Sequence, residues 1–173
     1  MGARAGIIAA VMALTAPLSG YALAHATAAS SAHGRPAAAV QLLSAERRGG
    51  NQYRRLAFAW ATGKRGCPYV YGGTGPCGDG YDCSGLVQAA YARIGFAIPR
   101  TTQEMLASGR LRRVNDPKRG DLSFYGSGHV ELYVGGNVTF GALNSSAGIG
   151  FHTWNRFWHP TAFLAVIGAG QRS

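Results

Sequence analysis

The segment Asp82-Cys83-Ser84-Gly85 contains the residues of this sequence that are best suited to chemistry. Asp82 is a good helix N-cap, so Cys83 is expected in the first turn of a helix. There the unpaired backbone N–H groups and the positive end of the helix dipole stabilise a thiolate, the nucleophilic form of cysteine. We also expect Gly85 to leave space beside the sulfur for a substrate backbone. A lone cysteine is more often an inert buried residue, but these local features favour a nucleophile.

A nucleophilic thiol needs a base, and the sequence contains five histidines. His25 and His33 precede the predicted domain, and His159 falls in a predicted loop. His129 begins a predicted strand directly after a glycine-rich turn, which lets other elements approach it closely. It is therefore the best candidate for the imidazole that holds the thiol proton. His152 lies on a later strand, and a histidine on a strand is often merely structural.

Helices are predicted ahead of the strands. Apolar residues at helical spacing predict a first helix from Tyr53 to Ala61 and a second from Cys83 to about Gly95. The pattern Thr101-x-x-Glu104 is a capping box, which predicts a short third helix from Thr102 to Ser108. The basic run from Arg110 to Arg119 is interpreted as a solvated connection to the strands.

From Gly120 onward the sequence alternates between polar and apolar residues, as half-buried strands do. On the strand that begins at His129, the side chains of His129, Glu131 and Tyr133 point one way. Helices followed by an antiparallel meander predict an α+β fold. The predicted strands span Asp121 to Tyr125, His129 to Val134, Val138 to Ala142, Ile149 to Trp154 and Ala162 to Ile167.

Length and composition leave room for one compact domain. The chain has 173 residues, of which 47% are hydrophobic, 14% are charged and 26 are glycine. It is too apolar for a disordered chain and too rich in glycine for a coiled coil. We predict one turn-rich domain over residues 51–173, preceded over residues 29–50 by a flexible tether rich in Ala, Ser, Gly and Arg.

Residues 1–28 have the pattern of a signal peptide. Arg4 precedes an almost wholly apolar run from Ala5 to Ala16, and small residues follow that suit cleavage near Ala24 to Ala28. The alternative is an uncleaved membrane anchor, but the run is well below the roughly 20 residues that a spanning helix needs. We therefore expect cleavage, export and no stable membrane anchor. Export makes disulfides possible.

Five segments together resemble the NlpC (and p-sixty) family of bacterial cell-wall cysteine endopeptidases. Each segment alone is a weak signal, but all five occur in the family's order over about Tyr53 to Gly168. The resemblance implies a papain-like fold, with N-terminal helices packed on an antiparallel sheet of about five to six strands. The segments are PYVYGG at Pro68 to Gly73, YDCSGLV at Tyr81 to Val87, IPRTTQE at Ile98 to Glu104, GDLSFY at Gly120 to Tyr125 and GHVELYVGG at Gly128 to Gly136.

The resemblance also implies roles for individual residues. By it, Cys83 is the nucleophile and His129 is the general base and acid. Tyr69 matches a tyrosine that lines the cleft near the thiol, and Asp82 and Ser84 are expected to line the substrate groove. Backbone amides around Cys83 are expected to supply part of the oxyanion hole.

The sequence departs from the family at the third catalytic position. The family commonly has a histidine in the strand after the HVxxYVG hairpin, but the straightforward register puts Gly141 there, which has no side chain. Asn144, three residues on, is the first candidate for the group that orients His129, because an amide oxygen can accept a ring N–H. His152 is the other candidate, and a water or a backbone carbonyl is a further alternative.

Three cysteines allow three pairings, each of which leaves one thiol free. With Cys83 as the catalytic thiol, a Cys67–Cys77 disulfide is the compatible pairing. The alternatives are two unpaired thiols or a regulatory disulfide to Cys83. No CxxC or HxxxH spacing supports a metal site, and neither a metal nor a cofactor is expected.

The resemblance implies a secreted thiol hydrolase, located in the cell wall, that cuts peptidoglycan stem peptides between a D-γ-glutamyl residue and a diamino acid. The alternatives are an N-acetylmuramoyl-L-alanine amidase on the same scaffold and a catalytically impaired wall-binding protein. The formal net charge of +10 suits anionic wall polymers as additional partners. No nucleic-acid partner is expected, because no recognition helix, stacking platform or zinc finger accompanies the arginines. We expect a monomer.

Overall fold

The computed structural model describes residues 52–168. The predicted signal peptide over residues 1–28 and the tether over residues 29–50 lie outside the described residues and stay predictions. Among the helices within residues 52–168, none combines the length and the apolar character that a membrane crossing requires.

Within the described residues, three helices precede the sheet where the sequence predicts them. The first spans residues 52–62, the second is α2 (Cys83–Ala92) and the third is α3 (Thr102–Ala107). α3 begins with the predicted capping box, in which the side chains of Thr101 and Glu104 each accept a hydrogen bond from the other residue's backbone N–H. Such caps satisfy N–H groups that helix geometry leaves unpaired, so local sequence is enough to predict the start of the helix.

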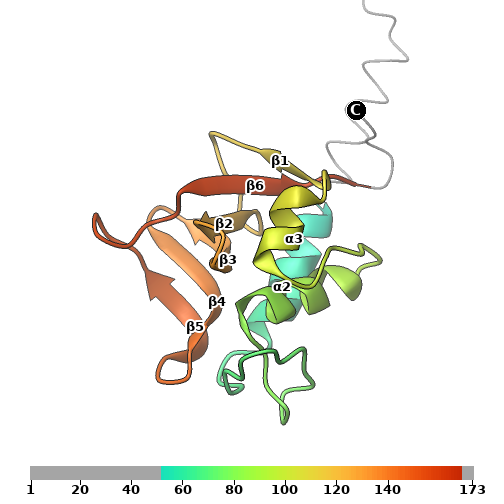
Figure 1. The fold of residues 1–173 in the computed structure, drawn as a ribbon, viewed down its shortest axis with the longest axis vertical. Coiled ribbons are helices and arrows are strands. Elements are labelled where there is room, and N and C mark those ends of the chain that lie inside the picture. Colours follow the sequence, from blue (N-terminus) through green and yellow to red (C-terminus); the bar gives the residue numbers. More distant parts are fainter. Residues whose placement is uncertain (1–51, 169–173) are drawn as a thin grey trace, which may run out of the picture. The chain divides into compact units, whose positions relative to one another are not determined.

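The strands form one antiparallel sheet of six, in the order β1-β6-β2-β3-β4-β5. The predicted α+β fold is therefore confirmed, and β2 to β5 form the predicted antiparallel meander. The last strand, β6, departs from the meander, because it returns from the end of the chain to lie between β1 and β2 (Figure 1). The strands are β1 (Leu111–Arg113), β2 (Leu122–Tyr125), β3 (His129–Gly135), β4 (Val138–Asn144), β5 (Gly148–Thr153) and β6 (Ala162–Val166).

β1 corrects one expectation. The run from Arg110 to Arg119 was predicted as a solvated connection, but Leu111–Arg113 pairs with β6, with Leu111 opposite Val166. Leu111 packs against the core while its two arginine neighbours are exposed. The pairing uses backbone groups and a strand that lies far away in sequence, and basic side chains on a solvent-facing edge do not reveal it.

A shared hydrophobic core joins the helices to the sheet, and α2 contacts β3 and β4 across it (Figure 1). This packing brings the start of α2 and the start of β3 together, so that Cys83 and His129 interact directly. The fully buried side chains that α2 and the sheet contribute include Leu86, Val87, Ala90, Leu122, Phe124, Val130, Leu132 and Phe140.

Residues 63–82 form the loop between the first helix and α2. A Cys67–Cys77 disulfide closes part of this loop and leaves Cys83 as the free cysteine. Tyr69 forms an isolated bridge with Tyr81, just before Cys83. The loop is therefore fixed both to itself and to the start of α2.

Candidate active site

Cys83 lies in the first turn of α2, as the sequence predicts. Asp82 caps the helix, and its Oδ1 accepts a hydrogen bond from Gly85 N at 2.6 Å. Cys83 is only 8% exposed, yet it lines a surface groove of about 390 Å³. The thiol is therefore shielded from most of the solvent and still open to a ligand in the groove.

Gly85 has a different role from the predicted one. A Cβ added at Gly85 would lie 2.0 Å from the carbonyl oxygen of Gly73, so the loop occupies the space that was expected to receive a substrate. The same carbonyl accepts a hydrogen bond from Asp82 N at 3.0 Å. Glycine at this position lets the loop meet the start of α2, and it thereby builds one wall of the groove.

Cys83 and His129 form an interacting pair between α2 and β3. Burial, the largest influence, raises the pKa of the Cys83 thiol, but hydrogen bonding to His129, its positive charge and the Val130 backbone N–H outweigh burial and lower that pKa. Burial lowers the pKa of His129, but hydrogen bonding and the negative charges of Cys83 and Glu131 outweigh it and raise that pKa to about 9. Both shifts favour a thiolate beside an imidazolium, which pairs a nucleophile with a proton donor as acyl transfer requires.

Glu131 is the third ionisable group of the site, and it was not among the site residues predicted from the sequence. It follows His129 by two residues on β3, is fully buried, and places Oε1 3.5 Å from His129 Nε2. That distance is long for a hydrogen bond, so the contact is mainly ionic. Burial raises the pKa of Glu131, but the contact with His129 and the hydrogen bonds from His152 and Thr139 outweigh burial and lower that pKa to about 2. Glu131 is therefore held as a carboxylate.

Asn144 does not reach His129. Its side chain is turned into the β4–β5 turn, where Oδ1 accepts hydrogen bonds from Ser146 N at 3.0 Å and Ala147 N at 2.8 Å. The residue is exposed, and a register shift after Ala142 separates it from the regular part of β4. The expectation that Asn144 orients the imidazole is therefore wrong.

His152, the alternative candidate, is separated from the imidazole of His129 by the carboxylate of Glu131. Its Nδ1 donates to Glu131 Oε1 at 2.6 Å, so it contacts the carboxylate that faces His129. Two signals for Glu131 were present in the sequence. Glu131 shares a strand face with His129, and Gly141 lacks a side chain at the position where the family has its third residue.

The three predicted substrate-contact residues all line the groove beside Cys83 and His129. Tyr69 belongs to the loop, and Asp82 and Ser84 flank the thiol. The groove is bounded by the loop and by the starts of α2, α3 and β3.

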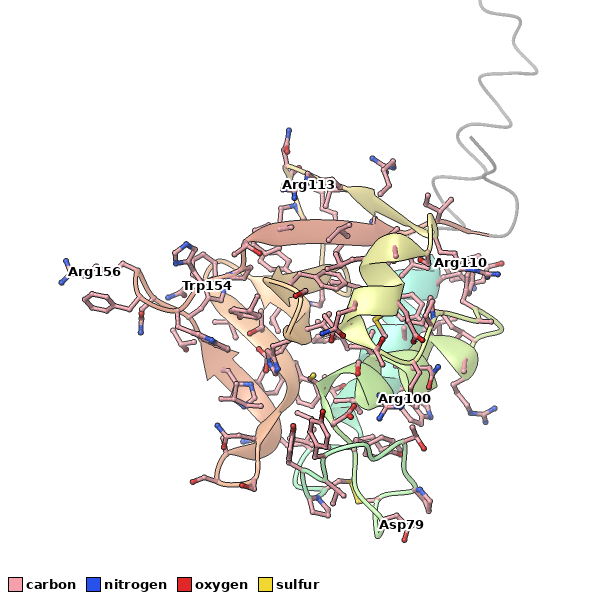
Figure 2. All side chains as sticks on the ribbon, in the orientation of Figure 1. Asp79, Arg100, Arg110, Arg113, Trp154 and Arg156 are labelled. Carbon is pink, nitrogen blue, oxygen red and sulfur yellow. A yellow bond between two sulfur atoms is a disulfide. The ribbon has the colours of Figure 1, made fainter. Side chains whose placement is uncertain are left out.

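Arg100, in the segment between α2 and α3, also lines the groove and ties its wall together. Nη1 donates to Asp82 Oδ1 at 3.0 Å and to Ser84 Oγ at 2.9 Å. Nη2 donates to Asp82 Oδ2 at 2.7 Å and to the carbonyl of Gly73 at 3.3 Å. Figure 2 shows Arg100 beside α2, on the side of the loop that carries Asp79. This arginine was not among the site residues predicted from the sequence.

Two aromatic rings cover the other side of His129. Trp158, from the segment between β5 and β6, stacks on Tyr125 with ring centroids 4.0 Å apart, and its centroid is 5.9 Å from that of His129. Such packing restricts the imidazole and limits its contact with water. Over residues 52–168, no group of three or more His, Cys, Asp or Glu side chains is arranged to hold a metal ion.

The fold, the buried thiol and the facing imidazole define a papain-like cysteine hydrolase scaffold. The profile of the NlpC/P60 family matches residues 66–166, so this chain belongs to the NlpC/P60 family. The papain-like α+β fold implied by the sequence is confirmed.

Named relatives have the same domain. The peptidoglycan endopeptidase RipB of Mycobacterium tuberculosis is 38% identical over 103 residues, which are 58% of this chain and 42% of RipB. The bifunctional muramidase/DL-endopeptidase CwlT of Bacillus subtilis is 38% identical over 87 residues, 46% of this chain and 26% of CwlT. The matches thus span less than half of these curated relatives. The solved structure of RipB matches with a TM-score of 0.58 and 30% identity, over 78% of this chain and 73% of that one.

Proposed function

We propose that this chain is a cysteine endopeptidase that hydrolyses amide bonds in the peptide stems of peptidoglycan. The observation that carries the proposal is the Cys83–His129 pair in an open groove, in which the thiolate is favoured. Membership of the NlpC/P60 family and likeness to RipB and CwlT supply the substrate class. The name of CwlT as a DL-endopeptidase supports a D-γ-glutamyl–diamino acid bond as the target.

The proposed reaction has two stages. The thiolate of Cys83 attacks the amide carbonyl, and the imidazolium of His129 gives its proton to the departing amine as the C–N bond breaks. Water then attacks the resulting thioester, with neutral His129 accepting its proton. As the C–S bond breaks, the acid product leaves and the thiolate of Cys83 is regenerated beside the imidazolium of His129. Backbone N–H groups near Cys83 in the first turn of α2 are proposed to stabilise the oxyanion of each tetrahedral intermediate.

Tyr69, Asp82 and Ser84 are proposed to contact the stem peptide from the loop side of the groove. Asp82 and Ser84 each accept a hydrogen bond from Arg100. Their side chains are therefore already ordered and lose little conformational freedom when a peptide binds.

The proposal extends to location and partners. The N-terminal pattern supports secretion with cleavage near Ala24 to Ala28, and the substrate supports action in the cell wall. We propose that the protein acts there as a monomer. Exposed arginines at the β1 edge, such as Arg110 and Arg113 in Figure 2, support attraction to anionic wall polymers.

Mass spectrometry of digested peptidoglycan tests this function. Wild-type protein is expected to release truncated stems that remain attached to sugar, and Cys83→Ala is expected to release none. Free stems beside bare sugar strands would instead identify an N-acetylmuramoyl-L-alanine amidase. If wild-type protein releases nothing but sediments with the wall, the chain is a wall-binding protein and the endopeptidase proposal fails.

A further inference from the structure

We propose that Glu131 positions the imidazole of His129 and that Gly141 is the vacancy on β4 that admits its carboxylate. The third group of the site then comes from the same strand as the histidine rather than from the next strand. Glu131 is a positioning residue here, because it acts on a substrate only through His129. This inference rests on the proposed hydrolase function.

The first support is an unsatisfied ring nitrogen. Within the described part of the chain, His129 Nε2 is buried and has no hydrogen-bond partner. We infer that the interaction with Cys83 is made through Nδ1, whereas Nε2 faces Glu131 Oε1 at 3.5 Å. An imidazolium has an N–H on each nitrogen, and a buried N–H needs an acceptor. Hydrogen bonds of catalytic groups are often long before a substrate binds, so this contact is expected to shorten during the reaction.

The second support is the set of hydrogen bonds that holds the carboxylate of Glu131. His152 Nδ1 donates to Oε1 at 2.6 Å, and the hydroxyl of Thr139 donates to Oε2. The Thr139 hydroxyl is in turn 3.2 Å from the hydroxyl of Tyr125, which donates to it because the threonine proton is already used. A buried carboxylate is strongly disfavoured without donors and a nearby positive charge. The donors are Thr139 and His152, and the imidazolium of His129 supplies the charge.

The third support is the relation between Glu131 and Gly141. Leu132 pairs with Phe140 in the β3–β4 register, so one further step places Gly141 directly opposite Glu131. A Cβ added at Gly141 would lie 2.6 Å from Glu131 Cγ and 2.9 Å from Oε1. A side chain at residue 141 and the carboxylate of Glu131 would therefore occupy the same space.

The space above Gly141 also explains how the side chain of Glu131 extends across β4 to β5. The side chain passes over β4 at Gly141 and meets His152 on β5, which pairs with Thr139 of β4. Gly141 has no left-handed backbone angle that would itself require glycine. The glycine is therefore needed for the space above it. The absence of a side chain at Gly141 and the presence of the buried carboxylate of Glu131 therefore depend on each other.

A relocation experiment tests the inference. In Glu131→Gly/Gly141→Glu the carboxylate starts from β4 instead of β3, and Glu131→Gly/Gly141→Gln is the matched control that differs from it only in charge. Glu131→Gln removes the charge at its present position. The readout is the rate of Cys83 alkylation by iodoacetamide across pH on the full chain, with folding followed by thermal unfolding.

Loss of the negative charge is expected to weaken the imidazolium and so to move thiolate formation to higher pH. At about pH 6 both Gln variants should be alkylated at least about tenfold more slowly than wild type, the change that follows from raising a pKa by one. Glu131→Gly/Gly141→Glu should recover most of that loss. The titratable and charged groups around the pair are Tyr69, Asp82, Arg100, Tyr125, Glu131 and His152, and only the carboxylate of Glu131 is changed or moved.

An unchanged pH profile in folded Glu131→Gln would overturn the inference. So would equal alkylation of the relocated Glu and Gln variants, which decides the matter if Glu131→Gln does not fold. A purely structural Glu131 predicts changes in unfolding temperature without a shift of the pH profile. Because alkylation needs no peptidoglycan, a failed digest with the expected pH shift would reject the proposed substrate and leave the positioning role intact.

Discussion

Replacing Arg100 by methionine should loosen the groove wall and destabilise the fold. The guanidinium donates four hydrogen bonds, to both carboxylate oxygens of Asp82, to Ser84 Oγ and to the carbonyl of Gly73. Methionine keeps much of the apolar stem and removes every donor, so the experiment isolates the charge and its hydrogen bonds.

The size of the effect follows from what Asp82 keeps. Breaking a fully buried ion pair costs about 3–5 kcal/mol, but Arg100 is 29% exposed and Asp82 retains hydrogen bonds from Gly72 N and Gly85 N. We therefore expect a loss of about 2–3 kcal/mol for Arg100→Met, typical of charge-assisted hydrogen bonds. Arg100→Lys should recover only part of this, because an ammonium group cannot bond both carboxylate oxygens in the geometry of a guanidinium.

The loss should also depend on pH. Burial raises the pKa of Asp82, but its hydrogen bonds with Arg100, Gly85 and Gly72 and the charge of Arg100 lower that pKa overall. A carboxyl group with a lowered pKa contributes stability above its unfolded pKa of about 3.9 and loses that contribution as pH falls through the folded value. The difference between wild type and Arg100→Met should therefore be full near neutral pH and shrink in acid.

Urea unfolding at pH 7 and at about pH 3 measures both effects, with activity followed in the peptidoglycan digest. Arg110→Met is the matched control, since exposed Arg110 donates to one backbone carbonyl, that of Ala97, and should change stability by less than about 0.5 kcal/mol. A loss for Arg100→Met no larger than that of the control, or one that grows in acid, would refute the reasoning.

Three further outcomes are expected. Gly85→Ala should lower the unfolding temperature sharply and abolish digestion, because its Cβ would lie 2.0 Å from a backbone carbonyl oxygen. In the control Gly78→Ala the Cβ meets nothing within 4 Å, so the unfolding temperature should hardly change. Equal unfolding temperatures of the two variants would contradict this expectation. Replacing both Cys67 and Cys77 by serine should cost about 2–3 kcal/mol in urea unfolding, as expected for a loop of this size, and no loss would show that the disulfide does not constrain the unfolded chain. The raised pKa of His129, about 9, should stabilise the folded state below its unfolded pKa of about 6.5, and this contribution should disappear as pH rises through about 9. The stability difference between wild type and His129→Ala measured from pH 6 to 10 tests it, and a difference that does not change with pH would count against an imidazolium in the resting site.

Local sequence was sufficient wherever neighbouring residues decide the structure. Asp82 caps α2, and Thr101 with Glu104 caps α3, because each cap bonds backbone groups within the next turn. The start of β3 at His129 followed from alternation, a property of a single strand. These local signals placed Cys83 and His129 at the starts of their elements.

Contacts between distant segments were beyond local sequence. β1 pairs with β6, some fifty residues later in the sequence. The pairing uses backbone groups, so the arginine side chains of β1 do not indicate it. Asn144 looked suitable because a small shift of register seemed to bring it to His129, but the irregularity after Ala142 turns it into the hairpin end. Neither result can be derived without knowing which strands are neighbours.

The amino-acid sequence by itself was sufficient to predict the three helices, the strands from β2 onward, the places of Cys83 and His129 in them, and the family, since these depend on short motifs and periodicity. Tertiary structure confirmed the predicted Cys67–Cys77 disulfide, and it alone decided why Gly85 is a glycine and which group faces the second nitrogen of His129. The physical reason is that a side chain such as Glu131 reaches across a strand only where the opposite residue leaves space. That space at Gly141 exists only once β3, β4 and β5 are in register.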